Sequence, residues 1–140
     1  QYRERGHVEL FGEYGGYPAG GHERDFVSVE DVVKVNLHWL DHPQTSGIFN
    51  LGTGQARSFN DLALATINSV RCAEDRPPLT LETALLDGVL RYCEFPEGLK
   101  HKYQVYTCAD LGQLREAGYR EPMLGLEEGV QRYCAQLLGR

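Results

Sequence analysis

Two closely spaced glycines, Gly52 and Gly54, lie between a short apolar run and an amphipathic segment in the stretch N-L-G-T-G-Q-A-R-S-F-N-D. Such a turn can cradle the phosphates of a dinucleotide if a third small residue lets the next helix pack closely on the strand. Arg57 stands at that third position. A P-loop is excluded as well, because no Gly-Lys-Ser or Gly-Lys-Thr follows. The sequence therefore favours a tight turn that leads to a helix capped by Ser58.

Oxidoreductive chemistry is a second possibility that the residue types allow. A tyrosine with a lysine four residues later can work as a pair, because the ammonium lowers the phenol pKa and holds a cofactor ribose. None of the eight tyrosines has a lysine at that spacing. There is also no G-x-S-x-G elbow and no other recognisable set of nucleophile, base and orienting group. We therefore predict that this chain holds no catalytic residues and no cofactor-binding residues.

Metal chemistry has one candidate pair. His38 and His42 are one helical turn apart and could share a metal ion. They stand beside Pro43 at the expected end of a helix, where imidazoles interact with the negative end of the helix dipole, and this second interpretation is favoured. The four cysteines contain no C-x-x-C pair, which indicates reduced, mostly buried thiols. We therefore predict no metal site.

Two clusters could bind an anion. Arg24 follows a glycine-rich loop at residues 12–21, and its guanidinium could make two parallel hydrogen bonds to a diphosphate. The alternative is a salt bridge from Arg24 to one of the nearby carboxylates of Glu23, Asp25 and Glu30. The second cluster is L-K-H-K-Y-Q at residues 99–104, which is either an anion site or a solvated basic turn.

Composition limits the class of protein. With 41% hydrophobic residues among 140, the chain can form one ordinary globular domain, and we expect residues 1–140 to form a single region. The net charge of −6 argues against a nucleic-acid partner, because such affinity comes from clustered Lys and Arg. No apolar run approaches membrane-spanning length, so we expect a soluble, cytoplasmic protein without a membrane partner. The first residue is Gln, which is consistent with a fragment of a longer chain.

Three helix starts share one capping chemistry. Ser28, Ser58 and Thr107 each have a carboxylate three residues later, which satisfies free amides and suits the positive end of the helix dipole. After Ser28, a stripe at helical spacing runs up to Pro43 through Val29, Val32, Val33, Leu37 and Leu40. After Ser58, the corresponding residues are Phe59, Leu62, Ala63, Thr66, Ile67 and Val70.

Two shorter patterns predict helices near the C-terminus. The helix after Thr107 passes through Leu111 and Leu114 and should end at Gly118. A last helix is expected from about Leu126, with a buried stripe of Val130, Tyr133, Cys134 and Leu137. Strands are expected between the helices at Val8–Phe11, Asp25–Ser28, Gly47–Leu51 and Leu90–Phe95. The order predicts a mixed α/β fold with short strands and about four helices.

Several motifs together resemble a known family. E-R-D-F-V-S-V-E-D-V at residues 23–32 resembles a segment in the C-terminal half of extended short-chain dehydrogenase/reductases that act on nucleotide sugars. Within that superfamily, the chain resembles the ADP-L-glycero-D-manno-heptose 6-epimerase family. Four stretches carry this resemblance: G-I-F-N-L-G-T-G at 47–54, the stretch from F-P to L-K-H-K-Y-Q at 95–104, T-x-A-D-L at 107–111 and A-G-Y at 117–119. The likeness covers almost the whole chain but only roughly the C-terminal half of such an enzyme. It implies the substrate-binding part of an extended short-chain dehydrogenase/reductase, without the N-terminal Rossmann half.

The resemblance also implies which residues contact the substrate. A stretch that borders the nucleotide sugar is matched by Phe11, Gly12, Glu13 and Tyr14. Arg24 matches an arginine expected on the diphosphate, and Tyr103 matches a tyrosine expected at the phosphates or the sugar. The sequence departs from the family's pattern in a longer loop at 15–23 and an extended stretch at 71–91, to which the patterns give no role.

If the whole enzyme follows this family, its substrate is ADP-heptose, its cofactor is NADP, and it inverts C6″ of the heptose without net redox change for lipopolysaccharide core synthesis. The cofactor motif and the catalytic Tyr and Lys residues then belong to the half that is absent here, so we expect this chain alone to be inactive. A homo-oligomer is expected for the intact enzyme. Two alternatives stay open: another nucleotide-sugar epimerase or dehydratase of the same superfamily, or a noncatalytic binding module that stands alone.

Overall fold

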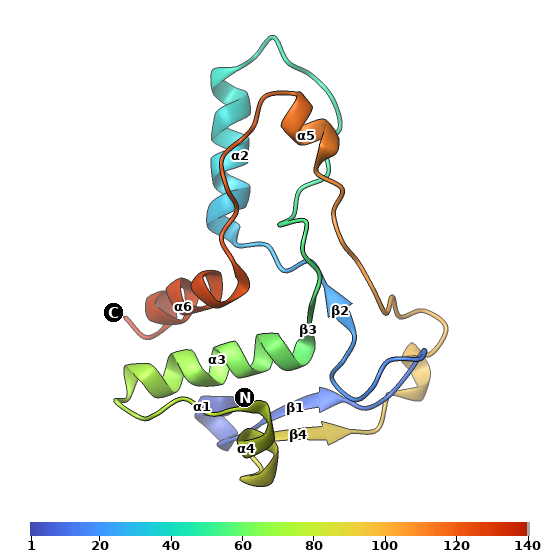
Figure 1. The fold of residues 1–140 in the computed structure, drawn as a ribbon, viewed down its shortest axis with the longest axis vertical. Coiled ribbons are helices and arrows are strands. Elements are labelled where there is room, and N and C mark those ends of the chain that lie inside the picture. The colour runs from blue at the N-terminus through green and yellow to red at the C-terminus, as the bar shows by residue number, and fades with distance from the viewer. Residues whose placement is uncertain (140) are drawn as a thin grey trace.

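A computed structural model describes residues 1–139, and Figure 1 shows α2 and α5 at one end of the molecule and the paired strands β1 and β4 at the other. The strands are β1 (Val8–Phe11), β2 (Glu23–Arg24), β3 (Arg57–Ser58) and β4 (Leu90–Cys93). The helices are α1 (Tyr2–Arg5), α2 (Val29–Asp41), α3 (Phe59–Ala73), α4 (Leu81–Leu86), the 3₁₀ turn η1 (Glu97–Leu99), α5 (Gly112–Glu116) and α6 (Leu126–Leu137). No helix in these residues is long and apolar enough to cross a membrane.

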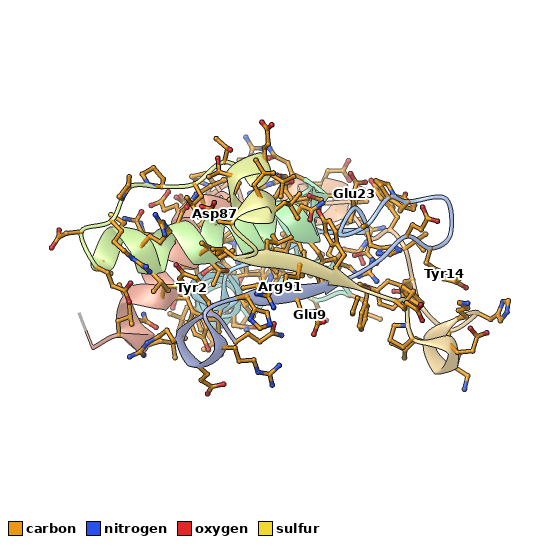
Figure 2. All side chains as sticks on the ribbon, turned by 90° about the horizontal axis from the view of Figure 1, so that it is seen from below. Tyr2, Glu9, Tyr14, Glu23, Asp87 and Arg91 are labelled. Atoms are coloured by element: carbon orange, nitrogen blue, oxygen red, sulfur yellow. The ribbon has the colours of Figure 1, made fainter. Side chains whose placement is uncertain are left out.

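The first core lies between the β1–β4 pair and the helices that connect these strands. The two strands run parallel, with Val8 opposite Leu90, and Figure 2 shows the next pair of the register, Glu9 and Arg91. Parallel strands need a crossover connection, and here α3 and α4 lie in that connection and contribute to the core. The buried side chains of this core are Ala63, Ile67, Ala84 and Leu90.

Ser58 caps α3 as the sequence predicts. Its hydroxyl accepts a hydrogen bond from the backbone N–H of Asp61 at 3.1 Å, and the Asp61 carboxylate accepts one from the N–H of Ser58 at 3.2 Å. This reciprocal arrangement is a capping box. Just before the cap, β3 pairs antiparallel with β2, with Arg24 opposite Arg57. The start of α3 is therefore fixed directly against the strand that carries Arg24.

Ser28 caps α2, also as predicted, by accepting a hydrogen bond from the N–H of Glu30 at 3.3 Å. The Asp31 carboxylate is fully buried and accepts hydrogen bonds from the N–H of Leu124 at 2.7 Å and from Lys34 at 3.1 Å. Asp31 thus ties α2 to the segment that precedes α6. The buried side chains of this second core are Val35, Leu114 and Tyr119.

The apolar stripe of α2 faces solvent over most of its length. The spacing correctly predicts the helix, yet the side chains of Val29, Val33, Leu37 and Leu40 are all at least half exposed. Val35, which lies outside that stripe, is buried with only 4% exposed. Periodicity therefore identifies the helix but not the face through which it packs in this chain.

Two predicted strands do not form within residues 1–139. Asp25–Ser28 continues beyond the short β2 ladder, which ends at Arg24. Gly47–Leu51 has no strand beside it, and Ile48 is 93% exposed. A strand is defined by its ladder partner, which a local sequence pattern cannot supply. The prediction for β1 is confirmed at both ends, whereas β4 stops at Cys93, two residues earlier than predicted.

The predicted cap at Thr107 is wrong. The backbone N–H of Thr107 donates to the carbonyl oxygen of Glu23 at 3.2 Å, so this residue joins the edge of β2 rather than a helix. The Asp110 side chain instead accepts from the N–H of Gly112 at 2.8 Å, where α5 begins. The predicted end is close to the observed one, since α5 stops at Glu116 and Gly118 has a φ of 116°.

α6 begins at Leu126, as predicted, and lies alongside α3 (Figure 1). Its predicted buried stripe is only partly correct. Leu126 and Cys134 are buried, but the side chains of Tyr133 and Leu137 are 55% and 64% exposed. The stripe is too wide because α6 contacts essentially one neighbouring helix, which covers a narrow face.

The cysteines are all free, as expected, but they are not mostly buried. Cys134 is buried, and burial raises the pKa of its thiol. Cys93 is half-buried, whereas Cys72 and Cys108 are exposed. Free thiols therefore lie both inside the fold and on its surface.

The stretch at 71–91 contains a helix that the sequence patterns miss. The Asn68 side chain donates to the carbonyl oxygen of Leu79 at 2.9 Å and accepts from the N–H of the same residue at 2.8 Å, which holds this stretch against α3. Thr80 then caps α4 by accepting from the N–H of Thr83 at 3.1 Å. With α4 and the short α1, residues 1–139 contain six α-helices rather than the four predicted.

Candidate functional site

Three of the six residues selected by the resemblance lie in one aromatic cluster. The ring centroid of Phe11 lies 5.4 Å from that of Phe95 and 6.3 Å from that of Tyr103. Tyr14 stacks on Phe95 at 4.3 Å, and Tyr103 meets Phe95 edge on at 5.2 Å. Phe95 is buried and lies at the centre of the group. The end of β1, the loop after it and the segment after η1 are therefore joined through one ring.

The fourth of these residues, Arg24, lies against the same cluster. Its guanidinium carbon is 5.0 Å from the centroid of the Tyr103 ring and 5.9 Å from that of Phe59, both within the range of a cation–π interaction. Its N–H groups donate to the carbonyl oxygen of Glu23 at 2.7 Å and to that of Gln104. Figure 2 shows Glu23, the residue before Arg24, toward the same end of the molecule as Tyr14.

The charge of Arg24 is not compensated by a carboxylate. In the part of the chain that the structure describes, the ion pairs involve other cations, so the alternative salt bridges to Glu23, Asp25 and Glu30 are not made. A guanidinium has five N–H donors, and the two carbonyl bonds leave others free. Arg24 is thus a fixed cation with unused donors beside an aromatic surface.

A small cavity of about 140 Å³ adjoins this surface. It is lined by Glu9, Leu10, Phe11, Gly20, His22, Phe59 and Tyr103. Aromatic rings make up much of this lining, so the cavity presents mainly flat, apolar surface.

Gly12 and Glu13 face a second, open groove instead. That groove lies beside the end of β4 and η1 and includes Tyr92 and Lys100. The backbone N–H of Gly12 donates to the carbonyl oxygen of Cys93 at 2.7 Å, and a Cβ at Gly12 would lie only 2.8 Å from the same oxygen. Glycine therefore allows β1 and β4 to stay paired beyond their ends. Glu13 is exposed and lies outside the aromatic cluster.

In the basic turn at 99–104, His101 and Lys102 are exposed and Lys100 is half-buried. Lys100 pairs with Glu97 at 2.6 Å, and this hydrogen-bonded carboxylate raises the pKa of Lys100. His101 has a φ of 65°, and its backbone N–H donates to the hydroxyl oxygen of Tyr14 at 2.7 Å. Tyr103 is the residue of this turn that joins the cluster with Arg24. The interpretation as a solvated basic turn therefore fits the lysines, whereas the interpretation as an anion site fits only Tyr103.

The glycine turn at 52–54 is not built to hold a dinucleotide phosphate. The backbone N–H groups of Thr53 and Gly54 donate to the Asp25 carboxylate at 2.7 and 2.9 Å, so they are already used. A phosphate at this turn would also meet the negative charge of Asp25. Burial raises the pKa of this carboxyl, but the hydrogen bonds from Thr53, Ala109 and Gly54 outweigh that effect and lower it below its ordinary value. The turn therefore has a structural role in this chain.

His38 and His42 lie together near the end of α2. Their rings stack with centroids 4.1 Å apart, and Nδ1 of His42 lies 2.7 Å from the carbonyl oxygen of His38. This hydrogen bond to a terminal helix carbonyl is the interaction that the sequence favours for an imidazole at this position. Across residues 1–139, no three His, Cys, Asp or Glu side chains gather as a metal site.

Sequence reasoning missed three members of the site: His22, Phe59 and Phe95. The sequence patterns place Phe59 on a helix stripe, and they place Phe95 at a strand end and in the motif at 95–104, with no site role for either residue. His22 directly precedes the motif at residues 23–32, but nothing in its local pattern indicates that it is buried with only 1% exposed. His22 is buried beside aromatic residues only because the loop after β1 folds over the ends of β1 and β4, and a local sequence pattern does not contain this information.

The fold matches part of the fold of extended short-chain dehydrogenase/reductases, so the predicted α/β fold class is confirmed. A solved NAD-dependent NDP-hexosamine 5,6-dehydratase involved in tunicamycin biosynthesis superposes on 99% of this chain with a TM-score of 0.63 and 23% identity. A solved UDP-N-acetylglucosamine 4-epimerase from Methanobrevibacter ruminantium superposes on 95% of it with a TM-score of 0.65 and 16% identity. This chain corresponds to 38% and 35% of the two enzymes' lengths.

No protein-family model matches the chain. Curated relatives named ADP-L-glycero-D-manno-heptose-6-epimerase are 66% identical in Pseudomonas paraeruginosa and 64% identical in Pseudomonas aeruginosa, each over 98% of this chain. The corresponding relative from Cupriavidus pinatubonensis is 55% identical over 100% of the chain. The chain spans 42% of the length of each of these relatives. Nearly the entire chain is therefore homologous to part of these epimerases, which confirms the resemblance found in the sequence.

Proposed function

We propose that this chain is the substrate-binding portion of an ADP-glyceromanno-heptose 6-epimerase and that Arg24 binds the diphosphate of ADP-heptose. The supporting observation is the Arg24 guanidinium itself. It lies 5.0 Å from the Tyr103 ring, is held by two carbonyls, and within residues 1–139 has no carboxylate partner. A planar guanidinium with unused N–H donors suits two oxygens of a diphosphate, because such charge-assisted pairs are short and directional.

The remaining candidate residues surround this cation in different ways. Tyr103 supports the guanidinium and offers its hydroxyl to the phosphates or the sugar. Phe11 and Tyr14 supply aromatic surface at the same cluster. Gly12 and Glu13 border the adjacent groove beside β4, so they would contact a more distant part of the nucleotide sugar.

For the whole protein we propose inversion at C6″ of ADP-heptose, with no net redox change and with NADP as the cofactor. The glycine turn at 52–54 does not fit a dinucleotide, because its amides already bind Asp25. We therefore place the cofactor site and the catalytic residues outside this chain and propose that the chain alone is inactive. Its contribution is to orient the sugar and to neutralise the diphosphate, which lowers the entropic cost of bringing the reacting carbon into place.

Residues 1–140 act as one region in this proposal, and the intact enzyme is cytoplasmic and homo-oligomeric. The second candidate is another nucleotide-sugar epimerase or dehydratase. The solved structures that share the fold favour it, since one is an NDP-hexosamine dehydratase and the other a UDP-N-acetylglucosamine epimerase. A noncatalytic binding module is a third candidate. Binding of a nucleotide sugar by this chain alone would agree with this candidate as well as with the first.

Calorimetric titration of this chain with ADP-heptose, UDP-N-acetylglucosamine and NADP in separate experiments tests the proposal. We expect heat from ADP-heptose, less or none from the uridine nucleotide, and none from NADP. Tighter binding of the uridine nucleotide would favour the second candidate. NADP binding without ADP-heptose binding would overturn both the assignment of Arg24 and the role of the glycine turn.

A further inference from the structure

His22 is a buried histidine that the proposed function leaves without a role. Its side chain is 1% exposed, and it lies two residues before Arg24. Within residues 1–139 it and Asp31 are the two polar or charged residues that are buried. Buried polar groups normally have hydrogen-bond partners because leaving them unsatisfied costs stability. The contacts of His22 therefore indicate what its imidazole does.

The imidazole holds the loop that follows β1. Nε2 of His22 lies 3.0 Å from the carbonyl oxygen of Tyr14. A carbonyl oxygen only accepts, so Nε2 carries the hydrogen and donates it. Tyr14 is also held at its other end, where its hydroxyl oxygen accepts from the backbone N–H of His101. One imidazole thus fixes a residue that bridges the loop after β1 and the turn after η1.

The same ring supports Tyr103. The two ring centroids are 5.2 Å apart and the rings are nearly perpendicular, at 75°. Tyr17 stacks against His22 at 5.8 Å, and Phe95 lies 5.6 Å away. Tyr103 in turn contacts Arg24 through its ring face. A continuous set of contacts therefore runs from the Tyr14 carbonyl through His22 and Tyr103 to the guanidinium.

We propose that His22 is a positioning residue for the Arg24 site: its Nε2–H fixes the Tyr14 loop, and its ring fixes the Tyr103 side chain that supports the guanidinium. The hydrogen bonds and cation–π contacts of the Arg24 guanidinium go to other residues, so His22 acts on it through Tyr14 and Tyr103. This inference rests on the proposed function, since it concerns the same diphosphate site. It adds a residue that the motif resemblance does not select.

Two amide variants separate the hydrogen bond from bulk packing. In His22→Gln, the terminal nitrogen is as many bonds from Cα as Nε2 of histidine, so it can donate to the Tyr14 carbonyl. In His22→Asn, the nitrogen is one bond shorter, matches Nδ1 instead, and leaves that carbonyl without its donor. Both variants lose the aromatic ring, so a difference between them reports the hydrogen bond. His22→Phe completes the set, because it keeps a ring and lacks the donor.

The first readout is NMR of the wild-type chain and its variants. A long-range ¹H–¹⁵N spectrum of the wild type should show His22 protonated at Nε2. In His22→Asn, the resonances of the His101 amide and of the Tyr103 ring should both move strongly. In His22→Gln, which keeps the donor, the His101 amide resonance should return toward its wild-type position. In His22→Phe, which keeps a ring, the Tyr103 ring resonances should do so. A wild-type imidazole with no hydrogen on Nε2 would overturn the inference, as would unmoved resonances in every variant.

The second readout is the Kd for ADP, the diphosphate probe, by calorimetry. We expect binding to weaken about fivefold or more in His22→Asn, with a smaller loss in His22→Gln, as suits one lost hydrogen bond. Equal affinity in the wild type and both amide variants would overturn the positioning role while leaving the proposed function intact. No ADP binding by a folded wild-type chain would overturn the proposed function, and the positioning role with it.

Discussion

The Asp25 carboxylate accepts a hydrogen bond from the backbone N–H of Thr53 at 2.7 Å and another from the Thr53 hydroxyl at 2.5 Å. It also accepts from the N–H groups of Gly54 at 2.9 Å and Ala109 at 3.0 Å. One side chain therefore joins the segment after β2, the glycine turn and the segment before α5. Asp25 follows Arg24 directly, so these four bonds also fix the backbone that presents the guanidinium.

Replacing Asp25 with asparagine should destabilise the fold, because the amide offers one acceptor oxygen and a competing donor in place of two acceptors. We expect a loss of about 1 to 3 kcal/mol of unfolding free energy near neutral pH. Urea denaturation of Asp25→Asn beside the exposed Asp41→Asn measures it. Equal losses in the two variants would contradict the structural role of Asp25.

The stability of the wild type should also fall in acid. Because the folded-state pKa of Asp25 is lowered, its contribution is present above the unfolded value of about 3.8 and is lost as pH falls through the folded pKa. The pKa values of Asp61 and Glu127 are lowered too, so they add to the same acid limb. Melting curves between about pH 5 and pH 2 should show a shallower decline in Asp25→Asn than in the wild type. Parallel declines would show that Asp25 is not linked to folding.

Two glycine-to-alanine substitutions should have opposite effects. A Cβ at Gly52 would lie 2.6 Å from the Cβ of Ala109 and would also collide with the Asp25 carboxylate, so Gly52→Ala should cost about 1 to 3 kcal/mol. A Cβ at Gly129, inside α6, meets nothing closer than the Cβ of Ser28 at 3.5 Å. Gly129→Ala should therefore stabilise by about 0.5 to 1 kcal/mol through helix propensity. Thermal unfolding of both variants checks the signs, and a stabilised Gly52→Ala would refute the close packing around Asp25.

The two faces of α2 should respond differently to truncation. Val35 is buried against Leu114 and Tyr119, so Val35→Ala should cost about 1 to 3 kcal/mol of unfolding free energy. Leu40 is 74% exposed, so Leu40→Ala should change it by less than about 0.5 kcal/mol. Chemical denaturation measures the pair. A larger loss of unfolding free energy in Leu40→Ala than in Val35→Ala would mean that the apolar stripe of α2 is buried.

Local chemistry in the sequence predicts the helix starts well. The caps at Ser28 and Ser58 and the beginning of α6 at Leu126 are all found where predicted, because a cap or a 3.6-residue period involves only neighbouring residues. The strand at Gly47–Leu51 is not found, because a strand depends on a partner elsewhere in the chain. The cap at Thr107 is wrong for the same reason, since its amide is used by Glu23.

Some residues of the candidate site can be predicted from the sequence, and others cannot. Arg24 and Tyr103 can be selected from their motifs, and the structure brings their side chains together although 78 residues lie between them in the sequence. Glu13 can be selected equally well, yet it is exposed and lies apart from the cluster. His22 and Phe95 become recognisable only in three dimensions, because their roles come from packing and not from sequence spacing.

A pair of tyrosine-to-phenylalanine variants tests how hydroxyl groups contribute to stability. The Tyr119 hydroxyl is buried without a hydrogen-bond partner among residues 1–139, and burial raises its pKa. Tyr119→Phe should therefore be neutral or stabilise by up to about 1 kcal/mol. The Tyr92 hydroxyl donates to the Asn60 side chain at 3.0 Å, so Tyr92→Phe should cost about 0.5 to 1.5 kcal/mol. Calorimetric melting of both variants shows which one is less stable. A large loss of unfolding free energy in Tyr119→Phe would show that the Tyr119 hydroxyl has a hydrogen-bond partner.

The central claim is that Arg24 binds the diphosphate of ADP-heptose, and calorimetric titration of the wild type, Arg24→Lys and Arg24→Ala with ADP-heptose tests it most directly. Losing a charge-assisted contact should weaken binding by about 1.5 to 3 kcal/mol in Arg24→Ala. Arg24→Lys should recover only part of this loss, because an ammonium cannot make the two parallel hydrogen bonds. Melting curves recorded on the same samples should show that all three proteins are folded. An unchanged dissociation constant in folded Arg24→Ala would contradict the claim.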